Sequence, residues 1–398
     1  MITVDDVRAA RARVQPVLRP TPTGVSDSLS GMCGRQVLLK SEHLQRTGSF
    51  KIRGAYNRIS HLLPGTDVVA ASAGNHAQGV ALAASLCGLK STIFMPVTAT
   101  FPKVEATRAY GAEIRLAGDV VDDCILMAKA YAEETGARYV PPFDDPLIIA
   151  GQGTLGLELA DEAPHAEVVL VPVGGGGLIS GVAVALAATR PGVRIVGVEA
   201  EGAASMAASL YAGRCVRLGA LSTMADGIAL KEPTPLTLEH VEAYVDDIVT
   251  VSDEEIGRAL ILLLERAKAV VEPSGAVGVA ALLAGKVAGT GPAVAVLSGG
   301  NVDPLLLIKL IEHGLSAAGR YLMMRVVVKD RPGALADVAR VVAAHGLNVL
   351  DVEHHRAGPR VGVDEVEILL TVEARDPDHG GEVVNALKGE GYGVALVS

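Results

Sequence analysis

The hydrophobic pattern before residue 314 consists of short apolar runs, typical of buried strands, that alternate with stretches of helical periodicity. Glycine follows several of these helical stretches, as is common at helix ends. The expected strands are Val37–Lys40, Val68–Ala71, Ser91–Met95, Glu113–Leu116, Val168–Val173, Arg194–Glu199, Ile248–Val251 and Ala293–Leu297. The expected helices are Thr3–Val14, Phe50–Leu62, Asn75–Cys87, Lys103–Tyr110, Val121–Thr135, Leu178–Thr189 and Asp253–Lys268. This alternation predicts an α/β fold with parallel sheets and flanking helices, divided into two lobes.

The pattern changes at the segment GLSAAGR, Gly314–Arg320, which has the composition of a linker. After it we expect, in order, strand Leu322–Val328, helix Ala334–His345, strands Val349–His354 and Glu365–Val372, helix His379–Gly389 and strand Val394–Val397. This βαββαβ order is typical of a ferredoxin-like module. We therefore divide the chain into a two-lobed region at 1–315, with the smaller lobe at about 50–150, a linker at 316–320 and a separate domain at 321–398.

Composition and charge narrow the class of protein. Hydrophobic residues make up 49% of the 398 residues and charged residues 20%, which indicates a globular chain rather than a disordered one. The formal net charge of -10 and the lack of any Lys or Arg block argue against nucleic acid and anionic membrane as partners. No apolar run is long enough for a membrane span, and the polar N-terminus is unlike a signal peptide. The four cysteines are far apart, so we expect reduced thiols in the cytoplasm, without a disulfide framework or metal cluster.

Four segments place glycine or polar residues where a predicted strand meets a helix, the edge at which ligands collect in open α/β sheets. In the first, SFKIRGA (Ser49–Ala55), Lys51 lies at the start of a helix. The helix dipole there disfavours a cation, and a Schiff-base lysine must be neutral to react. Taken alone, a surface lysine is the commoner interpretation.

The second segment, SAGNHAQG (Ser72–Gly79), follows an apolar strand, and its small residues would let backbone amides bind a carboxylate. Asn75 adds a neutral donor. The residue types fit equally well a helix cap at Asn75 and an exposed His76 in the first turn.

The third segment, GGGGL (Gly174–Leu178), favours a phosphate site at a helix N-terminus over a flexible turn, because four consecutive glycines cost chain entropy. It lacks the Lys-Ser/Thr of a P-loop and the GxGxxG spacing, so neither ATP nor a dinucleotide is expected. The fourth, LSGGN (Leu297–Asn301), could turn Ser298 toward a ligand, but a serine there is more often only a turn residue.

In this order, the four segments resemble those of threonine dehydratases in the fold type II PLP (pyridoxal phosphate) family. Four further segments fit the same family: PPFDDP (Pro141–Pro146), IAGQGT (Ile149–Thr154), ADGIA (Ala225–Ala229) and VEPSGA (Val271–Ala276). The likeness covers most of residues 5–315, and the ordered set is far more specific than any single motif. It makes a ligand-binding role the better interpretation for each of the four segments.

The resemblance implies a PLP-dependent ammonia-lyase that eliminates water from L-threonine, and from L-serine as well, to give a 2-oxo acid and ammonia. Lys51 would bind PLP covalently and then remove the Cα proton of the amino-acid substrate, with Phe50 packed on the cofactor ring. Asn75 would donate to the ring oxygen O3′, and Ser298 would face the pyridine nitrogen. The family also implies two sets of loop contacts, for the substrate carboxylate at Ser72, Ala73, Gly74, Asn75 and His76 and for the phosphate at Gly174, Gly175, Gly176, Gly177 and Leu178.

The C-terminal segment DRPGALADVARVVAAHGLNV (Asp330–Val349) resembles the first strand, loop and helix of an ACT domain, an amino-acid-sensing module. The resemblance implies regulation by a branched-chain amino acid such as isoleucine or valine, with Arg331, Gly333 and Asn348 as candidate contacts. A packing or oligomerisation module that has lost its ligand is an equally good interpretation. The family implies a homo-oligomer, a dimer or tetramer, and leaves biosynthetic and catabolic roles both open.

Two other interpretations compete with this one. A serine racemase shares the fold and most motifs. In the racemase a second serine of the SSGN loop is the acid on the substrate face opposite the lysine, and here Ala73 takes its place. The racemase metal site pairs a Glu with an Asp, whereas Glu199 is followed here by Ser205, so we expect no metal. A non-catalytic amino-acid sensor is a different class, and Lys51 argues against it because a sensor needs no Schiff-base lysine.

Overall fold

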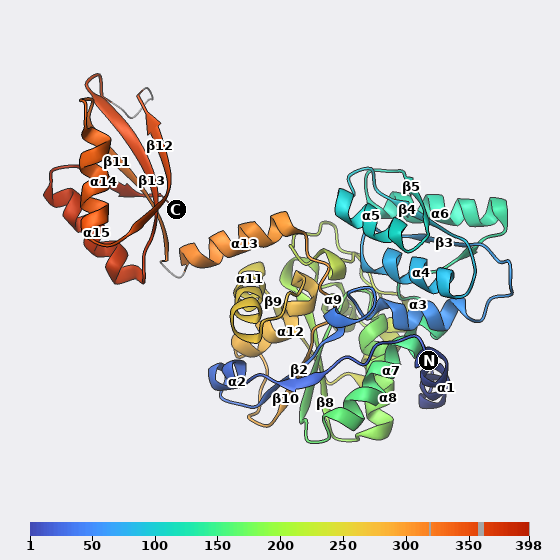
Figure 1. Ribbon diagram of the computed structural model, residues 1–398. Coiled ribbons are helices and arrows are strands. Elements are labelled where there is room, and N and C mark those ends of the chain that lie inside the picture. Colours follow the sequence, from blue (N-terminus) through green and yellow to red (C-terminus); the bar gives the residue numbers. More distant parts are fainter. Residues whose placement is uncertain (318–319, 357–361, 398) are drawn as a thin grey trace. The chain divides into compact units, whose positions relative to one another are not determined.

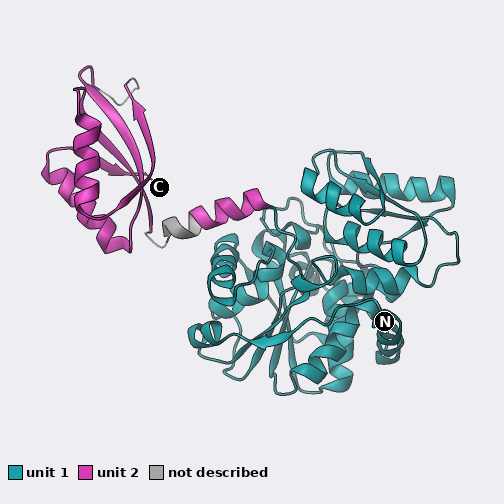
Figure 2. Cartoon of the chain, viewed as in Figure 1, with its two compact units in different colours: residues 1–303 teal, residues 304–398 magenta. Residues whose placement is uncertain are grey.

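The computed structural model describes residues 1–317, 320–356 and 362–397. The chain divides into two compact units, Met1–Asp303 and Pro304–Ser398 (Figures 1 and 2). Unit 1 holds two mainly parallel sheets, and unit 2 holds an antiparallel one. Among the described residues, no helix combines the length and the apolar character that a bilayer span requires.

The larger sheet of unit 1 has the strand order β1-β2-β10-β7-β8-β9, and only the β1–β2 pair is antiparallel. Its strands are β1 (Thr23–Val25), β2 (Val37–Lys40), β7 (Val168–Pro172), β8 (Arg194–Ala200), β9 (Asp247–Val251) and β10 (Ala293–Val296). The helices of this lobe are α1 (Val4–Val14), α2 (Asp27–Cys33), α7 (Pro146–Glu162), α8 (Gly177–Thr189), α9 (Ser205–Ala212), α10 (Pro235–Tyr244), α11 (Asp253–Leu262) and α12 (Pro273–Leu283). Because the strands are parallel, their carboxyl ends and the helices that follow them meet along one edge.

The smaller sheet of unit 1 has the order β5-β4-β3-β6 with every pair parallel. Its strands are β3 (Val68–Ala71), β4 (Ser91–Met95), β5 (Glu113–Leu116) and β6 (Arg138–Tyr139), and its helices are α3 (Lys51–Ile59), α4 (Asn75–Leu86), α5 (Phe101–Ala109) and α6 (Val121–Thr135). Ile52, Ala55 and Ile59 of α3 belong to the same buried core as β3, α4 and β4. The helix that begins at Lys51 is therefore packed into the smaller lobe.

The predicted two-lobed α/β fold is confirmed, and all eight strands expected in this region occur within one residue of their predicted ends. Two helices end earlier than expected. Helix α3 ends at Ile59 rather than Leu62, and α11 ends at Leu262, where a single π-helical turn, Leu263–Ala267, follows it. The left-handed Lys268, with φ of 56°, then ends that turn.

Helix α7 is the largest element that the sequence pattern does not predict. Its side chains are buried without a break from Ile148 to Leu157, so no polar face marks a helical period. It also contains three glycines, which disfavour a helix. A Cβ atom at Gly151 would lie 2.6 Å from a backbone oxygen of α3, and one at Gly156 would lie 2.7 Å from a backbone oxygen of α8. The glycines thus allow α7 to pack backbone against backbone on both neighbours.

Unit 2 contains the predicted βαββαβ module, with sheet order β12-β13-β11-β14 and antiparallel pairing throughout. Its elements are β11 (Tyr321–Lys329), α14 (Ala334–Ala344), β12 (Asn348–His355), β13 (Glu365–Glu373), α15 (Pro377–Gly389) and β14 (Gly393–Leu396). Helix α13 (Pro304–Ala317) precedes them, so residues 314–317 of the expected linker are helical, while 318–319 lie outside the described residues. The division into units falls at Asp303, earlier than the boundary placed after residue 315, because α13 groups with unit 2.

Candidate active site

Lys51 lies where three distant segments of unit 1 meet. It is the first residue of α3, and the preceding Phe50 donates its backbone N–H to the Ser298 carbonyl at 3.1 Å. Lys51 Nζ donates to the Pro142 carbonyl at 3.0 Å and lies 5.2 Å from the centroid of the Phe50 ring. The motifs SFKIRGA, PPFDDP and LSGGN, which are far apart in sequence, therefore meet around the start of α3, where Lys51 lies.

The environment of Lys51 favours its neutral form. Burial lowers the pKa of Lys51 from its usual 10.5 to about 8, and the Glu272 carboxylate opposes this shift. A neutral amine can attack a carbonyl and accept a proton, whereas an ammonium group can do neither. The lowered pKa agrees with a reactive lysine, but its main cause is desolvation rather than the helix dipole that the sequence suggested.

The start of α4 offers backbone donors to an anion. Gly74 donates its N–H to Ser72 Oγ at 3.1 Å, which folds the loop back on itself. Within the described part of the chain, no hydrogen bond occupies the backbone N–H groups of Ala73, Asn75 and His76. Free amides at a helix N-terminus suit a carboxylate, as the sequence predicts for this loop.

Two contacts fix the amide group of Asn75. Its Nδ2 donates to Glu272 Oε1 at 2.6 Å, and Asn301 Nδ2 donates to its Oδ1 at 2.7 Å. The donor side of Asn75 therefore faces Glu272, and one Nδ2 hydrogen is left for a ligand. Gly74, not Asn75, is the N-cap residue of α4, so the cap interpretation of Asn75 is wrong.

His76 is buried rather than exposed, because its ring turns into the protein. Burial and the nearby Lys51 lower the pKa of His76 to about 3, so the imidazole is neutral. Its Nε2 donates to the Val140 carbonyl at 2.9 Å. The side chain is committed to this bond, and only the backbone amide of His76 remains available to a substrate.

Glu272, the N-cap residue of α12, belongs to the same site, although the motif VEPSGA by itself assigns it no role. Glu272 is 5% exposed. Burial raises the pKa of Glu272 to about 7, and Asp226 acts in the same direction, while Asn75, Lys103 and Lys51 oppose the shift. The site thus contains a second group that titrates near neutrality. The one sequence signal for it is a charged residue directly before an apolar helix that opens with proline.

The four glycines connect β7 to α8 and leave no room for side chains. Gly176 is left-handed, with φ of 87°, and is the N-cap residue of α8. A Cβ atom at Gly177 would lie 2.8 Å from Phe143 Cβ, and one at Gly175 would collide with the Phe143 ring. In the described chain, no hydrogen bond occupies the amides of residues 174–178. A row of free amides at the start of a helix of 13 residues fits the phosphate of the expected cofactor.

The remaining predicted cofactor contacts are Ser298, Phe50 and Leu178, and they differ in how far their side chains are buried. Ser298 is 3% exposed and lies two residues after β10, at the carboxyl end of a central strand. Phe50 is half-buried and packs against the core of the larger lobe. The Leu178 side chain is part of that core, so only its backbone amide can face a ligand.

Glu199, the residue compared with a racemase metal ligand, is used differently here. Its two carboxylate oxygens accept the backbone N–H groups of Met206 and Ala207, each at 2.8 Å, which caps the start of α9. Burial raises the pKa of Glu199 to about 7. Among the described residues there is no group of three or more His, Cys, Asp or Glu side chains that could hold a metal ion.

In unit 2 the structure does not bring the candidate effector contacts together. Gly333 is the N-cap residue of α14, and Arg331 precedes it and pairs with Asp337 at 2.8 Å. Asn348 lies beyond the other end of α14 and pairs with Glu373 at the far end of the sheet. The 11 residues of α14 span roughly 16 Å. One chain therefore cannot place both ends against the same small ligand.

Comparisons with known proteins agree with this site. Residues 14–299 match the family described as pyridoxal-phosphate dependent enzyme, and residues 323–391 match the ACT domain. The L-threonine ammonia-lyase of Thermotoga maritima is 47% identical over the full length of both chains. Among solved structures, a threonine deaminase from T.th. is 44% identical with a TM-score of 0.73, covering 76% of this chain and 99% of its own. A maize serine racemase is 38% identical with a TM-score of 0.74, covering 79% of this chain and 98% of its own.

The family match spans most of the chain and includes Lys51 and both amide loops. The ACT match lies within unit 2 and covers the module from β11 to α15, ending just before β14. The chain accordingly belongs to the pyridoxal-phosphate dependent enzyme family, and it carries an ACT domain at its C-terminal end.

Proposed function

We propose that this chain is an L-threonine ammonia-lyase, which eliminates water from L-threonine and releases ammonia to give 2-oxobutanoate, and which also converts L-serine to pyruvate. The observation that carries the proposal is Lys51, a half-buried lysine of lowered pKa that lies in one lobe with the amides of α4 and beside the loops of the other. The full-length relative named L-threonine ammonia-lyase supports the choice of reaction.

When bound, PLP supplies an electron sink for the bonds at the substrate Cα. Lys51 Nζ would attach the cofactor and, once displaced by the substrate, would take the Cα proton as a neutral amine. The loop at 72–76 would hold the substrate carboxylate, and the amides of 174–178 would hold the phosphate. Asn75 would donate its remaining Nδ2 hydrogen to the cofactor O3′, and Ser298 would face the pyridine nitrogen with a neutral hydroxyl.

Serine racemisation is the nearest alternative, since the maize serine racemase shares the fold. A racemase needs an acid on the substrate face opposite Lys51. Ala73 places a methyl group at the loop position where that hydroxyl would lie. We therefore expect elimination products and no D-serine from L-serine.

The ACT domain supports amino-acid regulation of the enzyme. We propose a branched-chain amino acid as its effector, in a homodimer or homotetramer where Arg331 and Gly333 of one copy and Asn348 of another serve as contacts. We also propose 1–315 as the catalytic domain, 316–320 as the linker and 321–398 as the regulatory domain. The four free cysteines suit a reducing compartment, the cytoplasm.

The test is the absorbance spectrum of the purified protein before and after L-threonine is added, with 2-oxobutanoate assayed in the same cuvette. We expect a yellow protein that forms 2-oxobutanoate, and we expect Lys51→Ala to lose both properties. A protein that stays colourless and inert after PLP is added would overturn the proposal. That outcome would favour the amino-acid sensor.

A further inference from the structure

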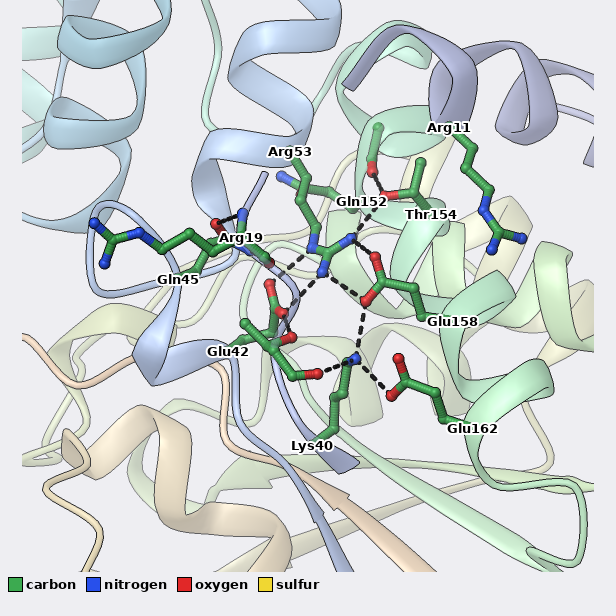
Figure 3. A network of polar contacts seen from close by, with 12 residues as sticks. Arg11, Arg19, Lys40, Glu42, Gln45, Arg53, Gln152, Thr154, Glu158 and Glu162 are labelled. Carbon is green, nitrogen blue, oxygen red and sulfur yellow. Dashed lines mark hydrogen bonds and ion pairs between the residues drawn. The ribbon is translucent and has the colours of Figure 1, made fainter. Parts of the chain in front are cut away.

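Arg53, two residues after Lys51, lies at the centre of a buried charge network (Figure 3). The side chains of Arg53 and Glu42 are both 0% exposed. Nε and Nη2 of Arg53 donate to the two oxygens of Glu42 at 2.7 and 2.8 Å. Nη1 and Nη2 donate to the two oxygens of Glu158 at 2.6 and 2.9 Å, and Nη1 also donates to Thr154 Oγ1 at 3.0 Å. All five N–H donors of the guanidinium group are therefore used.

A second cation completes the network. Lys40 Nζ lies 2.9 Å from an oxygen of Glu158 and 2.9 Å from an oxygen of Glu162, and it donates to the Thr21 carbonyl at 2.8 Å. Burial alone would lower the pKa of Arg53, but the charges and hydrogen bonds of Glu42 and Glu158 raise it, so Arg53 stays charged. Such a network is stable only while every partner is present, because a charge left alone in the interior is costly.

The partners of Arg53 come from elements outside the smaller lobe. Glu42 lies in a short 3-10 helix, Glu42–Leu44, directly after β2 of the larger sheet, and Glu158 lies on α7. Arg53 itself is on α3, whose apolar face belongs to the core of the smaller lobe. Its guanidinium group therefore joins the first turn of α3 to two elements of the larger lobe.

The backbone of the same turn of α3 packs closely against α7, which leaves it little freedom to move. Gly54 donates its N–H to Gln152 Oε1 at 3.2 Å, and a Cβ atom at Gly151 of α7 would lie 2.6 Å from the Arg53 carbonyl. Lys51 and Arg53 share one helical turn, so a shift or rotation of α3 that strains the Arg53 bonds also moves Lys51 Nζ.

We propose that Arg53 is a positioning residue. By bridging Glu42 and Glu158 it sets the position of α3 along its axis and its rotation about that axis, and so fixes where Lys51 Nζ lies in the site. This inference rests on the proposed role of Lys51 as the residue that binds PLP. Arg53 acts through geometry rather than charge, because its charge is matched by the carboxylates around it. Burial is what lowers the pKa of Lys51, and Glu272, not Arg53, is the charged group that acts on it, by opposing this shift.

The experiment compares Arg53→Met and Arg53→Lys with the parent and with Lys40→Met. Lys40 is equally buried and belongs to the same network, but it pairs with α7 and with the Thr21 carbonyl rather than with α3, so Lys40→Met measures the general effect of breaking the network. For each protein, borohydride reduction in saturating PLP traps the cofactor on Lys51, and mass spectrometry gives the trapped fraction. kcat, KM for L-threonine and the unfolding midpoint are measured in parallel.

We expect both Arg53 variants to lower the trapped fraction and to reduce kcat by roughly 10- to 100-fold, with a much smaller change in KM. Arg53→Lys keeps the charge but has only three donors and no planar fork, so it should not restore kcat. Lys40→Met should lower the unfolding midpoint while keeping the trapped fraction and kcat near those of the parent.

The inference is overturned if Arg53→Lys matches the parent in trapped fraction and kcat, or if Lys40→Met loses as much of both as the Arg53 variants do. If Arg53→Met does not fold, Arg53→Lys carries the comparison. Failure of the proposed function would look different, because the parent itself would then trap no cofactor on Lys51.

Discussion

The half-buried Lys51 and the buried Glu272 are two ionisable groups in one site, and each affects the protonation of the other. Burial lowers the pKa of Lys51 to about 8 and raises that of Glu272 to about 7. The ionised carboxylate stabilises the ammonium form of Lys51, and the ammonium stabilises the carboxylate. Glu272 therefore limits how far burial can neutralise the lysine.

Replacing Glu272 with Gln removes the negative charge that holds the pKa of Lys51 up, so this pKa should fall further below about 8. PLP uptake by the cofactor-free protein needs the neutral amine, so its rate should rise with pH. The pH midpoint of that rise, followed by absorbance, should move to lower pH in Glu272→Gln. Glu105→Gln on α5 is the control, since Glu105 is partly exposed and lies outside the site. A midpoint that stays in place or moves to higher pH would contradict this coupling.

Ser298 offers a second test at the scale of one side chain. In the proposed site a neutral hydroxyl, not a carboxylate, faces the pyridine nitrogen. Ser298→Asp would favour the protonated nitrogen, so we expect slower elimination and a new transamination side reaction. Assays for 2-oxobutanoate and for conversion of PLP to its amine form measure both, with Ser298→Ala as the neutral control. Unchanged elimination without transamination would refute the hypothesis.

At the scale of single elements, the loop between β7 and α8 shows how glycine permits a binding site. Gly175→Ala would force a methyl group against the Phe143 ring and displace the amides beside it. Losing one hydrogen bond to a charged phosphate costs about 1.5–3 kcal/mol. PLP should therefore bind at least about tenfold more weakly, as measured by titration of the cofactor-free protein.

The matched control for the loop is Gly31→Ala in α2, where no atom lies within 4 Å of the added methyl group. It should leave PLP affinity unchanged. If the two variants lost PLP affinity equally, the loop would not be the phosphate site.

The strands and most solvent-facing helices could be predicted because their patterns are local. Strands β3 and β4 match their predicted ranges, and α6 ends where Gly136 adopts a left-handed conformation, as a glycine after a helix suggests. Helices α7 and α12 could not, and helices α2, α9, α10 and α13 are also absent from the predicted elements. In α7 and α12 burial on nearly all sides leaves no polar face to mark a helical period, and both contain glycine. Their identity depends on close packing with neighbours that are distant in sequence.

The residues of the site also fall into those with a local sequence signal and those that only tertiary packing reveals. The glycine loop and Lys51 carry local signals, namely a strand–glycine–helix junction and a lysine at a helix start. Glu272 can be assigned to the site only from the fold, which brings the start of α12 against Asn75. The buried His76 shows the converse, because its residue type and helix position suggest exposure and the tertiary packing overrides them.

At the scale of the whole molecule, the proposed catalytic residues all lie in Met1–Asp303. A shortened chain of residues 1–317, which keeps α13 intact, should retain 2-oxobutanoate formation. The same chain should lose any response to isoleucine or valine, since the ACT domain is absent. Steady-state assays of both chains with each amino acid make the comparison. A shortened chain that still responds would place the effector site in unit 1.

The separation of Arg331 and Gly333 from Asn348 has a consequence for how any effector would act. Along β13, the partners of Lys329 and Asn348 are Glu365 and Glu373, eight residues and roughly 26 Å apart. A small amino acid that contacts both ends must lie between two copies of the chain. Its apparent affinity would then depend on protein concentration through mass action. Dilution alone would weaken the response, so an assay at nanomolar enzyme and a crowded cell would report different sensitivities for the same protein.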